Sequence, residues 1–426
     1  MINTKIDISK LYLISKERLC EIVLLAGFLL AYYSTLYPWF LWPIKNHAGS
    51  LAGLILMGML FMLPKAKTLL TRTDFLLPLI LFIFLDIYEH LAGQSNFLGF
   101  ITIVFRATTL MVLFRLSIDY LPKLMHVLTI VMAVLQVFAI FGFMLYLAGF
   151  TLPSRDVSFD NEFYYFTNYF FFLLDDRSLF SIVPRFQSYF IEPNYHGTAC
   201  VLLLLYQSGK WKKWYNIVLL VATLLSFSLS AYVLLVVTVF LNMWRQGKNV
   251  IKSLLITSII IGSGVAGTFL YNDGDNLVHD LILMRLEIED GELAGNNRIT
   301  DNFKNEYENY LKSGDIMFGR DRDMSEFGNS GYQVYIYENG LVGLFLLLSF
   351  YIAATYKAEN KRNLISAYIL AALIFGVNGY ITWYQIFIPI FCTAYAGTTN
   401  LQHYEEKEKE DDESIETTED FKPITT

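Results

Sequence analysis

The chain has 426 residues, of which 55% are hydrophobic and 16% aromatic, while 17% are charged, and its formal net charge is −7. A soluble globular chain carries about 25% charged residues, so this composition excludes an ordinary soluble enzyme. Several apolar runs approach or exceed the roughly 18 residues that cross a bilayer. The sequence therefore predicts an all-α polytopic integral membrane protein, and no nucleic-acid partner is expected.

Apolar runs along the chain predict about twelve transmembrane helices. The first run shows no cleavage site for a signal peptidase, so we expect it to be a retained span. The expected spans are, in chain order, 20–42, 48–64, 75–91, 97–117, 124–150, 194–209, 214–229, 231–245, 253–271, 332–356, 363–378 and 380–397.

Lysine and arginine residues set the predicted orientation, because cytoplasmic connections are rich in them. With an even number of spans both termini lie on one side, and that side carries basic clusters such as Lys210, Lys212 and Lys213. Both termini are therefore expected in the cytoplasm. Residues 1–397 are predicted to form the membrane domain, and the acidic tail 398–426 is predicted to be disordered.

Two long polar segments, 151–193 and 272–331, are predicted to face outward, while every other external connection is short. Any chemistry is therefore expected on the extracytoplasmic side. Lys213 and Arg245 are both expected inside, yet two full crossings between them need about 40 helical residues. The sequence TLLSFSLSAY is therefore predicted to be a hairpin tip that stops short of the outer interface.

The stretch VPRFQSYFIEPNYHGTAC ends the first outer segment and gathers several polar residues just before an apolar run. Pro193 suits the first turn of a helix, which we expect to begin near Asn194. Free amides at this helix start, together with Arg185, suit a phosphate, while Glu192 or His196 suits deprotonation of a hydroxyl. Ordinary interfacial polarity, with Glu192 paired to Arg185 and His196 as a cap, is the alternative.

The second outer segment has fourteen acidic and six basic residues, counted over 272–331. Arg320 and Arg322 precede a Gly/Asn/Ser turn at its end, and Arg298 lies further upstream. A few placed arginines in an acidic segment are more typical of a binding site than of a general anion-attracting surface. Local salt bridges with neighbouring aspartates are the alternative for each arginine.

Arg106 lies in the middle of a predicted span, where a charge is costly and is a functional hypothesis by default. Asp86 and Glu89 lie at a similar depth, so a structural ion pair and a substrate-binding arginine are both open. Glu338, near the outer end of the tenth span, is either a binding carboxylate or an interfacial cap. The run NEFYYFTNYFFFLL is expected to be an aromatic belt, a sugar-stacking surface or, over 162–174, a short amphipathic helix.

Two motifs carry a family resemblance. A segment of the form R-F-x-x-x-F-x-E-P-N-x-x-G leads into a span, and a Gly-rich turn much later runs into Y-x-x-E-x-G-L-V-G-L. This pattern resembles the bacterial O-antigen polymerase family, often called Wzy, with its relatives the O-antigen ligases and the capsule or exopolysaccharide polymerases. The Ser-rich hairpin also looks like one that these proteins carry between neighbouring spans.

The resemblance implies a metal-independent glycosyltransferase of the integral-membrane GT-C class, with no cofactor. Its donor and acceptor would be oligosaccharides linked to undecaprenyl pyrophosphate at the outer face of a bacterial inner or plasma membrane, with a flippase and a chain-length regulator as partners. The family's arginine, ten residues, glycine spacing is met by Arg320 and Gly331 and missed by one residue at Arg185 and Gly197.

The resemblance implies that arginines of the two long segments hold the pyrophosphate or the glycan. Together with the residue chemistry above, it gives Arg185, Arg320, Glu192 and His196 as candidate catalytic residues, with Glu192 as the first candidate base. The candidate substrate-binding residues are Arg298, Arg322, Arg106, Asn194, Tyr332 and Glu338.

Three other functions remain as alternatives. The ligases carry a functional histidine in the second outer segment, where His279 is the only histidine and lies far from the Gly turn, which favours a polymerase. A flippase for lipid-linked oligosaccharides would need charges lining a central cavity, and a non-enzymatic scaffold or sensor would tolerate loss of the arginines. The scattered Cys20, Cys200 and Cys392 and the absence of an HExxH motif predict no metal site, and the sequence has no Walker loop or GxSxG motif either.

Overall fold

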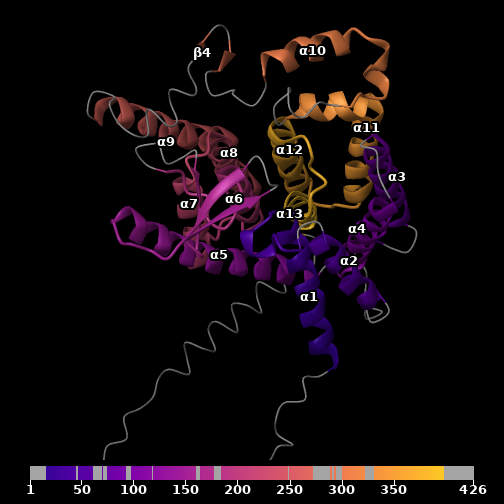
Figure 1. Ribbon diagram of the computed structural model, residues 1–426, viewed down its shortest axis with the longest axis horizontal. Helices are drawn as coiled ribbons and strands as arrows, with labels where there is room; N and C mark the ends of the chain where they lie inside the picture. Colours follow the sequence, from indigo (N-terminus) through magenta and orange to yellow (C-terminus); the bar gives the residue numbers. More distant parts are fainter. Residues whose placement is uncertain are drawn as a thin grey trace, which may run out of the picture.

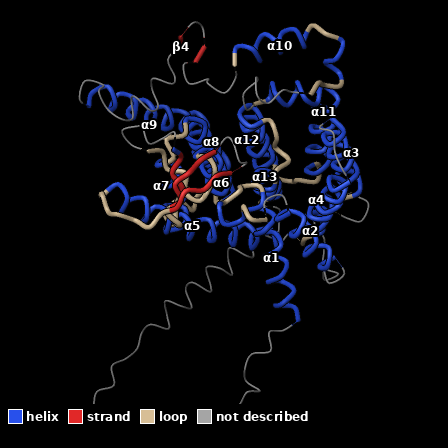
Figure 2. Tube along the Cα trace, viewed as in Figure 1, coloured by secondary structure: helices blue, strands red, loops and turns tan. Residues whose placement is uncertain are grey.

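The computed structural model describes most of the chain, and the described part is mostly helical (Figures 1 and 2). The described residues are 16–44, 47–60, 70, 74–92, 97–117, 119–159, 164–176, 184–247, 249–271, 288–289, 292–293, 300–321 and 331–397.

Helices account for nearly all of the regular structure, and each predicted span contains one. The α-helices are α1 (Lys16–Ser34), α2 (His47–Leu60), α3 (Leu76–Ala92), α4 (Phe97–Arg115), α5 (Tyr120–Leu147), α6 (Pro193–Tyr206), α7 (Trp214–Leu225), α8 (Leu229–Arg245), α9 (Val250–Leu270), α10 (Asp301–Leu311), α11 (Tyr332–Thr355), α12 (Lys361–Asn378) and α13 (Tyr384–Tyr395). Two short 3-10 helices, η2 (Trp39–Leu41) and η7 (Gly314–Met317), join them.

Two of the described helices, α5 and α11, are long and apolar enough to cross a membrane. Helix α5 has 28 residues, which corresponds to a length of about 42 Å at 1.5 Å per residue. Shorter apolar helices, α2, α7, α8 and α13 among them, lie alongside.

Helix α11 is broken rather than straight. Gly340 has φ +61° and ψ −170°, which divides the helix into two parts. The first part runs beneath α10, and the second part runs alongside α3 (Figure 1). Because left-handed φ values strain any residue with a Cβ, a glycine is required at this break. The break places Glu338 and Asn339 at the end of the first part.

Helix α13 forms the centre of the bundle. All twelve of its residues are buried, and it packs against α12, α6, α1, α11 and α5 (Figure 1). Its Pro389 lies inside the helix, where the missing amide leaves one carbonyl without its helical partner. The apolar helices on either side of α13 therefore share one core.

The first outer segment contains a three-stranded antiparallel sheet, with strands β1 (Arg155–Phe159), β2 (Tyr164–Asn168) and β3 (Leu173–Asp175) in that order. The alternative of an amphipathic helix over 162–174 is therefore wrong. Along β2 the burial alternates, since Tyr165 is exposed and Phe166 is buried against Trp42. This two-residue period suits a half-buried strand and not a helix. Two further strands, β4 (Ile288–Glu289) and β5 (Glu292–Leu293), pair in the second segment.

The predicted hairpin tip is present between α7 and α8. Ser226 and Ser228 are buried, and the hydroxyl of Ser226 both donates to the Thr223 carbonyl, over 2.7 Å, and accepts the Ser228 amide, over 3.2 Å. Protein groups thus satisfy the non-helical backbone of the turn, as burial of such a turn demands.

Candidate functional site

The helix that follows the first outer segment begins where the sequence predicts. Glu192 has an extended backbone and precedes Pro193, the first residue of α6. Proline is favoured here because its fixed φ suits a helix and its missing amide would have had no helical partner. Glu192 is partly exposed, whereas Asn194 and His196 are buried.

Asn194 is the centre of a polar network that joins three elements. Its side-chain amide donates to the side-chain oxygen of Asn378 at the end of α12, over 3.2 Å. Its own oxygen accepts hydrogen bonds from Ser230 at the start of α8, over 2.6 Å, and from Thr198, over 3.2 Å. Neutral amides and hydroxyls, rather than a bound anion, therefore satisfy this buried group.

The end of the second outer segment reaches the same end of α12. Gly379, which ends α12 with φ +76°, approaches Gly331, which precedes α11 with φ +109°. A Cβ on Gly379 would lie 2.7 Å from the carbonyl oxygen of Gly331, so the two backbones pack without room for a side chain. The two sequence motifs, one ending near Asn194 and one beginning near Gly331, thus meet around Asn378.

His196 lies in the packed interior, with 0% of its surface exposed. Its Nε2 is 3.3 Å from the carbonyl oxygen of Ala222, and its ring packs against Phe186 and Phe190. A general base must reach the hydroxyl it deprotonates. The structure therefore does not support His196 as a base, and a packing role fits its surroundings.

Arg185 lies beside the serine hairpin. Its side chain is half-buried, and its charge acts on His196 and on Tyr232 of α8. The backbone amide of the next residue, Phe186, donates a hydrogen bond to the carbonyl oxygen of Leu225 at the end of α7. Arg185 therefore lies near the α7–α8 hairpin and near His196 of α6.

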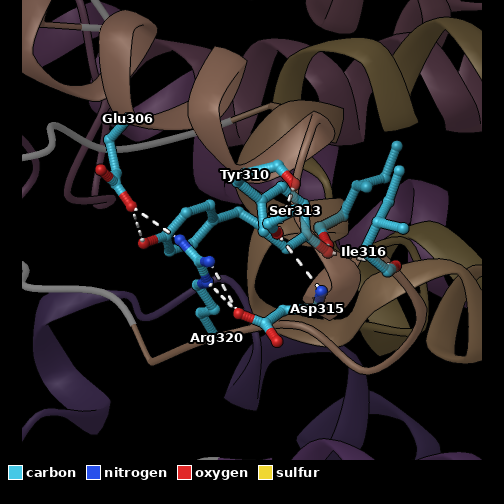
Figure 3. A network of polar contacts seen from close by, with 8 residues as sticks. Glu306, Tyr310, Ser313, Asp315, Ile316 and Arg320 are labelled. Carbon is cyan, nitrogen blue, oxygen red and sulfur yellow. Dashed lines mark hydrogen bonds and ion pairs between the residues drawn. The ribbon is translucent and has the colours of Figure 1, made fainter.

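The break in α11 is covered by the segment that carries Arg320 (Figure 3). The hydroxyl of Tyr310 donates to the carbonyl oxygen of Ile336, over 2.8 Å. The backbone amide of Arg320 donates to the carbonyl oxygen of Tyr337, over 2.7 Å. The last carbonyls of a helix lack partners within it, so these two donors replace the helical bonds that the break removes.

The segment that carries Gly319 and the break at Gly340 pack backbone against backbone, because neither glycine has a side chain. A Cβ on Gly340 would lie 2.7 Å from the amide nitrogen of Gly319, and one on Gly319 would lie 2.8 Å from that of Asn339. Around them Phe303, Tyr307 and Tyr310 of α10 form a small apolar cluster with the first part of α11.

The guanidinium of Arg320 is held by two carboxylates (Figure 3). It pairs with Glu306 over 3.0 Å and with Asp315 over 2.7 Å, and it lies over the ring of Tyr310 at 5.7 Å. The hydrogen bond to Asp315 raises the pKa of Arg320, and burial raises the pKa of Tyr310 to about 12. The salt-bridge interpretation therefore describes Arg320 here, and Arg185 and Arg320 belong to different clusters.

Two acidic groups lie between α3, α11 and the α12–α13 turn. Glu338 accepts a hydrogen bond from the hydroxyl of Tyr380, and Glu89 accepts one from Tyr335, over 3.0 Å. The rings of Tyr335 and Tyr380 pack edge to face with centroids 5.2 Å apart. Glu338 thus faces the turn that follows α12, directly after Asn378.

Arg106 forms an ion pair with Asp86 and lies over the ring of Phe82 at 5.3 Å. Asp86 is buried, and Arg106 is mostly covered. The structural ion pair, one of the two interpretations left open by the sequence, therefore describes this pair.

Three aromatic side chains form a row next to the Asn194 network. The rings of Tyr195 and Trp383 are 6.0 Å apart with planes 31° apart, and those of Trp383 and Tyr380 are 6.3 Å apart with planes 11° apart. All three residues are partly exposed. This row was not predictable from the sequence, because Tyr380 and Trp383 follow α6 by more than 170 residues and the Asn-Gly turn before them is a common signal.

The remaining predicted residues divide into two groups. Tyr332 is 45% exposed at the start of α11, next to Gly331. Arg298 and Arg322 lie outside the described residues. In the part of the chain that the structure describes, no group of three His, Cys, Asp or Glu side chains is placed to hold a metal ion.

Comparison with known proteins gives no relative: no family model, no curated protein and no solved structure matches this chain.

Proposed function

We propose that this protein is a membrane glycosyltransferase that polymerises lipid-linked oligosaccharide repeat units. It would cross the bacterial inner or plasma membrane about twelve times, with both termini in the cytoplasm and the two long segments outside. The growing glycan would pass from undecaprenyl pyrophosphate to a new lipid-linked repeat unit, without a cofactor.

The observation that carries this proposal is that the two motifs of the family resemblance come together at one end of α12. Asn194 bonds to Asn378, and Gly331 packs on the neighbouring Gly379. A transferase that joins two lipid-linked substrates needs one site to which both outer segments contribute, and this convergence fits that need.

In the proposed reaction an acceptor hydroxyl attacks the anomeric carbon of the donor. The new glycosidic C–O bond forms, the bond to pyrophosphate breaks, and the hydroxyl proton passes to a carboxylate. Glu192, partly exposed at the start of α6, is the proposed base. Arg185 would stabilise the developing charge on the leaving pyrophosphate, together with Arg298 or Arg322.

Arg320 takes a different part in this proposal. Its guanidinium is already shared by Glu306 and Asp315, so it is proposed to position the second outer segment over the broken helix. Substrate binding by Arg320 would require those ion pairs to open first.

The test is deletion of the gene in its own host, with the surface glycan separated on a gel. Complementation uses wild type, Arg185→Ala and Glu192→Ala, with Arg155→Ala, an exposed arginine of β1, as the matched control and with expression checked by blot. Loss of the long-chain ladder while single repeat units remain supports a polymerase.

Other results lead to other functions. Full-length chains left on the lipid carrier would indicate a ligase, and repeat units retained on the cytoplasmic face would indicate a flippase. An unchanged ladder after deletion contradicts every glycan-related function.

A further inference from the structure

The aromatic row beside the Asn194 network has polar groups at both ends. Glu192 precedes Tyr195 by less than one helical turn, and their backbones are joined by a 3.1 Å hydrogen bond. At the other end the hydroxyl of Tyr380 donates to Glu338. Between these ends, Trp383 bridges the rings of Tyr195 and Tyr380.

The planes of the three rings differ by 31° and 11° along the row. Similar near-parallel pairs occur in the buried core, for example between Phe387 and Phe391 with 27°, so the partial exposure of the three rings, and not their alignment, distinguishes the row. Since each residue is partly exposed, part of this surface faces away from the packed interior. The row therefore presents partly exposed aromatic surface beside the Asn194 network.

Such a surface has the chemistry that recognises carbohydrate. A pyranose ring has a face of C–H groups, which packs on an aromatic ring, and an edge of hydroxyls, which needs hydrogen-bond acceptors and donors. Binding sites of this kind combine apolar and aromatic walls with a few placed polar groups. Glu338, with one oxygen on Tyr380, is placed to accept a hydroxyl at the edge of the row.

The competing explanation is an aromatic belt at the membrane interface, which would also place Trp and Tyr at this level. A belt needs no carboxylate beside its tyrosine hydroxyls, which face the water layer. The hydroxyl of Tyr380 instead donates to Glu338, which the belt does not explain.

We infer that Tyr195, Trp383 and Tyr380 form a carbohydrate-stacking platform, on which one sugar of the glycan is held with a hydroxyl directed at Glu338. The inference rests on the proposed function, and it assigns the glycan to a surface made by α6 and the turn before α13. Transfer would then occur at the Glu192 end of the platform.

The experiment measures binding of oligosaccharides of one to three repeat units, released from the host's own surface polysaccharide, to purified protein in detergent by saturation-transfer NMR. Trp383→Leu keeps apolar bulk and removes the aromatic face, while Trp383→Phe keeps a face. We expect Trp383→Leu and Tyr380→Leu each to weaken binding roughly threefold to tenfold, and Trp383→Phe to stay within about twofold of wild type.

The matched control is Tyr165→Leu, an aromatic of the outer sheet that is 52% exposed. It is expected to bind like wild type, and an equal loss in this variant would favour the belt and overturn the platform. Each variant is compared by size-exclusion profile and thermal midpoint, and if one of the two Leu variants fails to fold the other supplies the result.

The platform and the proposed function can fail separately. If deletion of the gene leaves the ladder unchanged, the proposed function fails. If deletion removes the ladder, but Trp383→Leu and Tyr380→Leu restore it fully and bind the oligosaccharides like wild type, the platform alone is overturned.

Discussion

Asn194 at the start of α6 donates a hydrogen bond to Asn378 at the end of α12, although 184 positions separate them in the sequence. Asn194→Ala would leave Asn378 and Ser230 without this partner in a buried place. We expect a loss of about 1–3 kcal/mol in the free energy of unfolding. The measurement is denaturant unfolding in a fixed detergent. Asn305→Ala, at an exposed position of α10, should stay within about 0.5 kcal/mol of wild type.

Gly340 is predicted to be intolerant of a side chain. In Gly340→Ala the Cβ would meet the Met317 carbonyl carbon at 2.6 Å and the residue would keep a left-handed φ, so we expect a loss of about 1–3 kcal/mol. Gly58→Ala is the control, because its Cβ would meet nothing within 4 Å in α2, and it should be neutral or slightly stabilising. Equal effects of the two changes on unfolding would contradict the broken helix.

The role of Arg320 can be separated from substrate binding. If it positions the second outer segment, the double variant Asp315→Asn/Glu306→Gln should reduce glycan output as much as Arg320→Gln, on the order of tenfold. Output is read from ladder density at matched expression, with Arg155→Gln as control. A full loss in Arg320→Gln with normal output from the double variant would instead mean that Arg320 binds substrate.

The Arg106–Asp86 pair should behave as a structural ion pair. Arg106→Met leaves Asp86 as an uncompensated buried charge, so we expect a loss of about 3 kcal/mol, most of which Arg106→Met/Asp86→Leu restores. Arg115→Met, at the end of the same helix, should lose less than about 1 kcal/mol. Restored stability without restored glycan output would show that Arg106 has a further function.

The outer sheet is predicted to weaken as pH rises. Burial, with the nearby charges of Asp156 and Asp175, raises the pKa of Asp176 just after β3. A carboxyl whose folded-state pKa is raised holds its proton more tightly in the folded state. Its contribution to stability is therefore fully present below the unfolded-state pKa and is lost as pH rises through the folded-state pKa.

Hydrogen exchange of residues 155–175, corrected for intrinsic rates, should therefore show protection that falls as pH rises through the titration of Asp176. Asp176→Asn should flatten this dependence, and Glu308→Gln on α10 should leave it unchanged. A dependence that survives in Asp176→Asn would assign it to another group.

Much of the helical framework could be predicted from the sequence, because apolar runs of the right length have few alternatives to helix. The start of α6 followed from Pro193, and the short hairpin followed from the spacing of Lys213 and Arg245. The sheet over 164–175 was missed because a dense aromatic run hides a two-residue period. Tyr165 is exposed and Phe166 is buried only once β2 pairs with its neighbouring strands, so this alternation cannot be read from the sequence.

The site was harder to predict, because its partners are distant in sequence. Glu192, Asn194 and Glu338 were singled out, but Asn378 and Trp383 carry no local signal that would join them. The burial of His196 was also not predictable, since a polar residue one turn into a helix can face the core as readily as the solvent. The break at Gly340 was also hidden, because glycine is frequent in straight membrane helices.

The complete burial of α13 has a consequence for the order of synthesis. This helix is the last of the described ones to leave the ribosome, yet α1, α5, α6, α11 and α12 all pack on it. The helices synthesised earlier therefore cannot complete their packing until residues 384–395 are inserted. A nascent chain stopped before Tyr384 would lack the helix on which α1, α5, α6, α11 and α12 pack, and their facing apolar surfaces would stay uncovered.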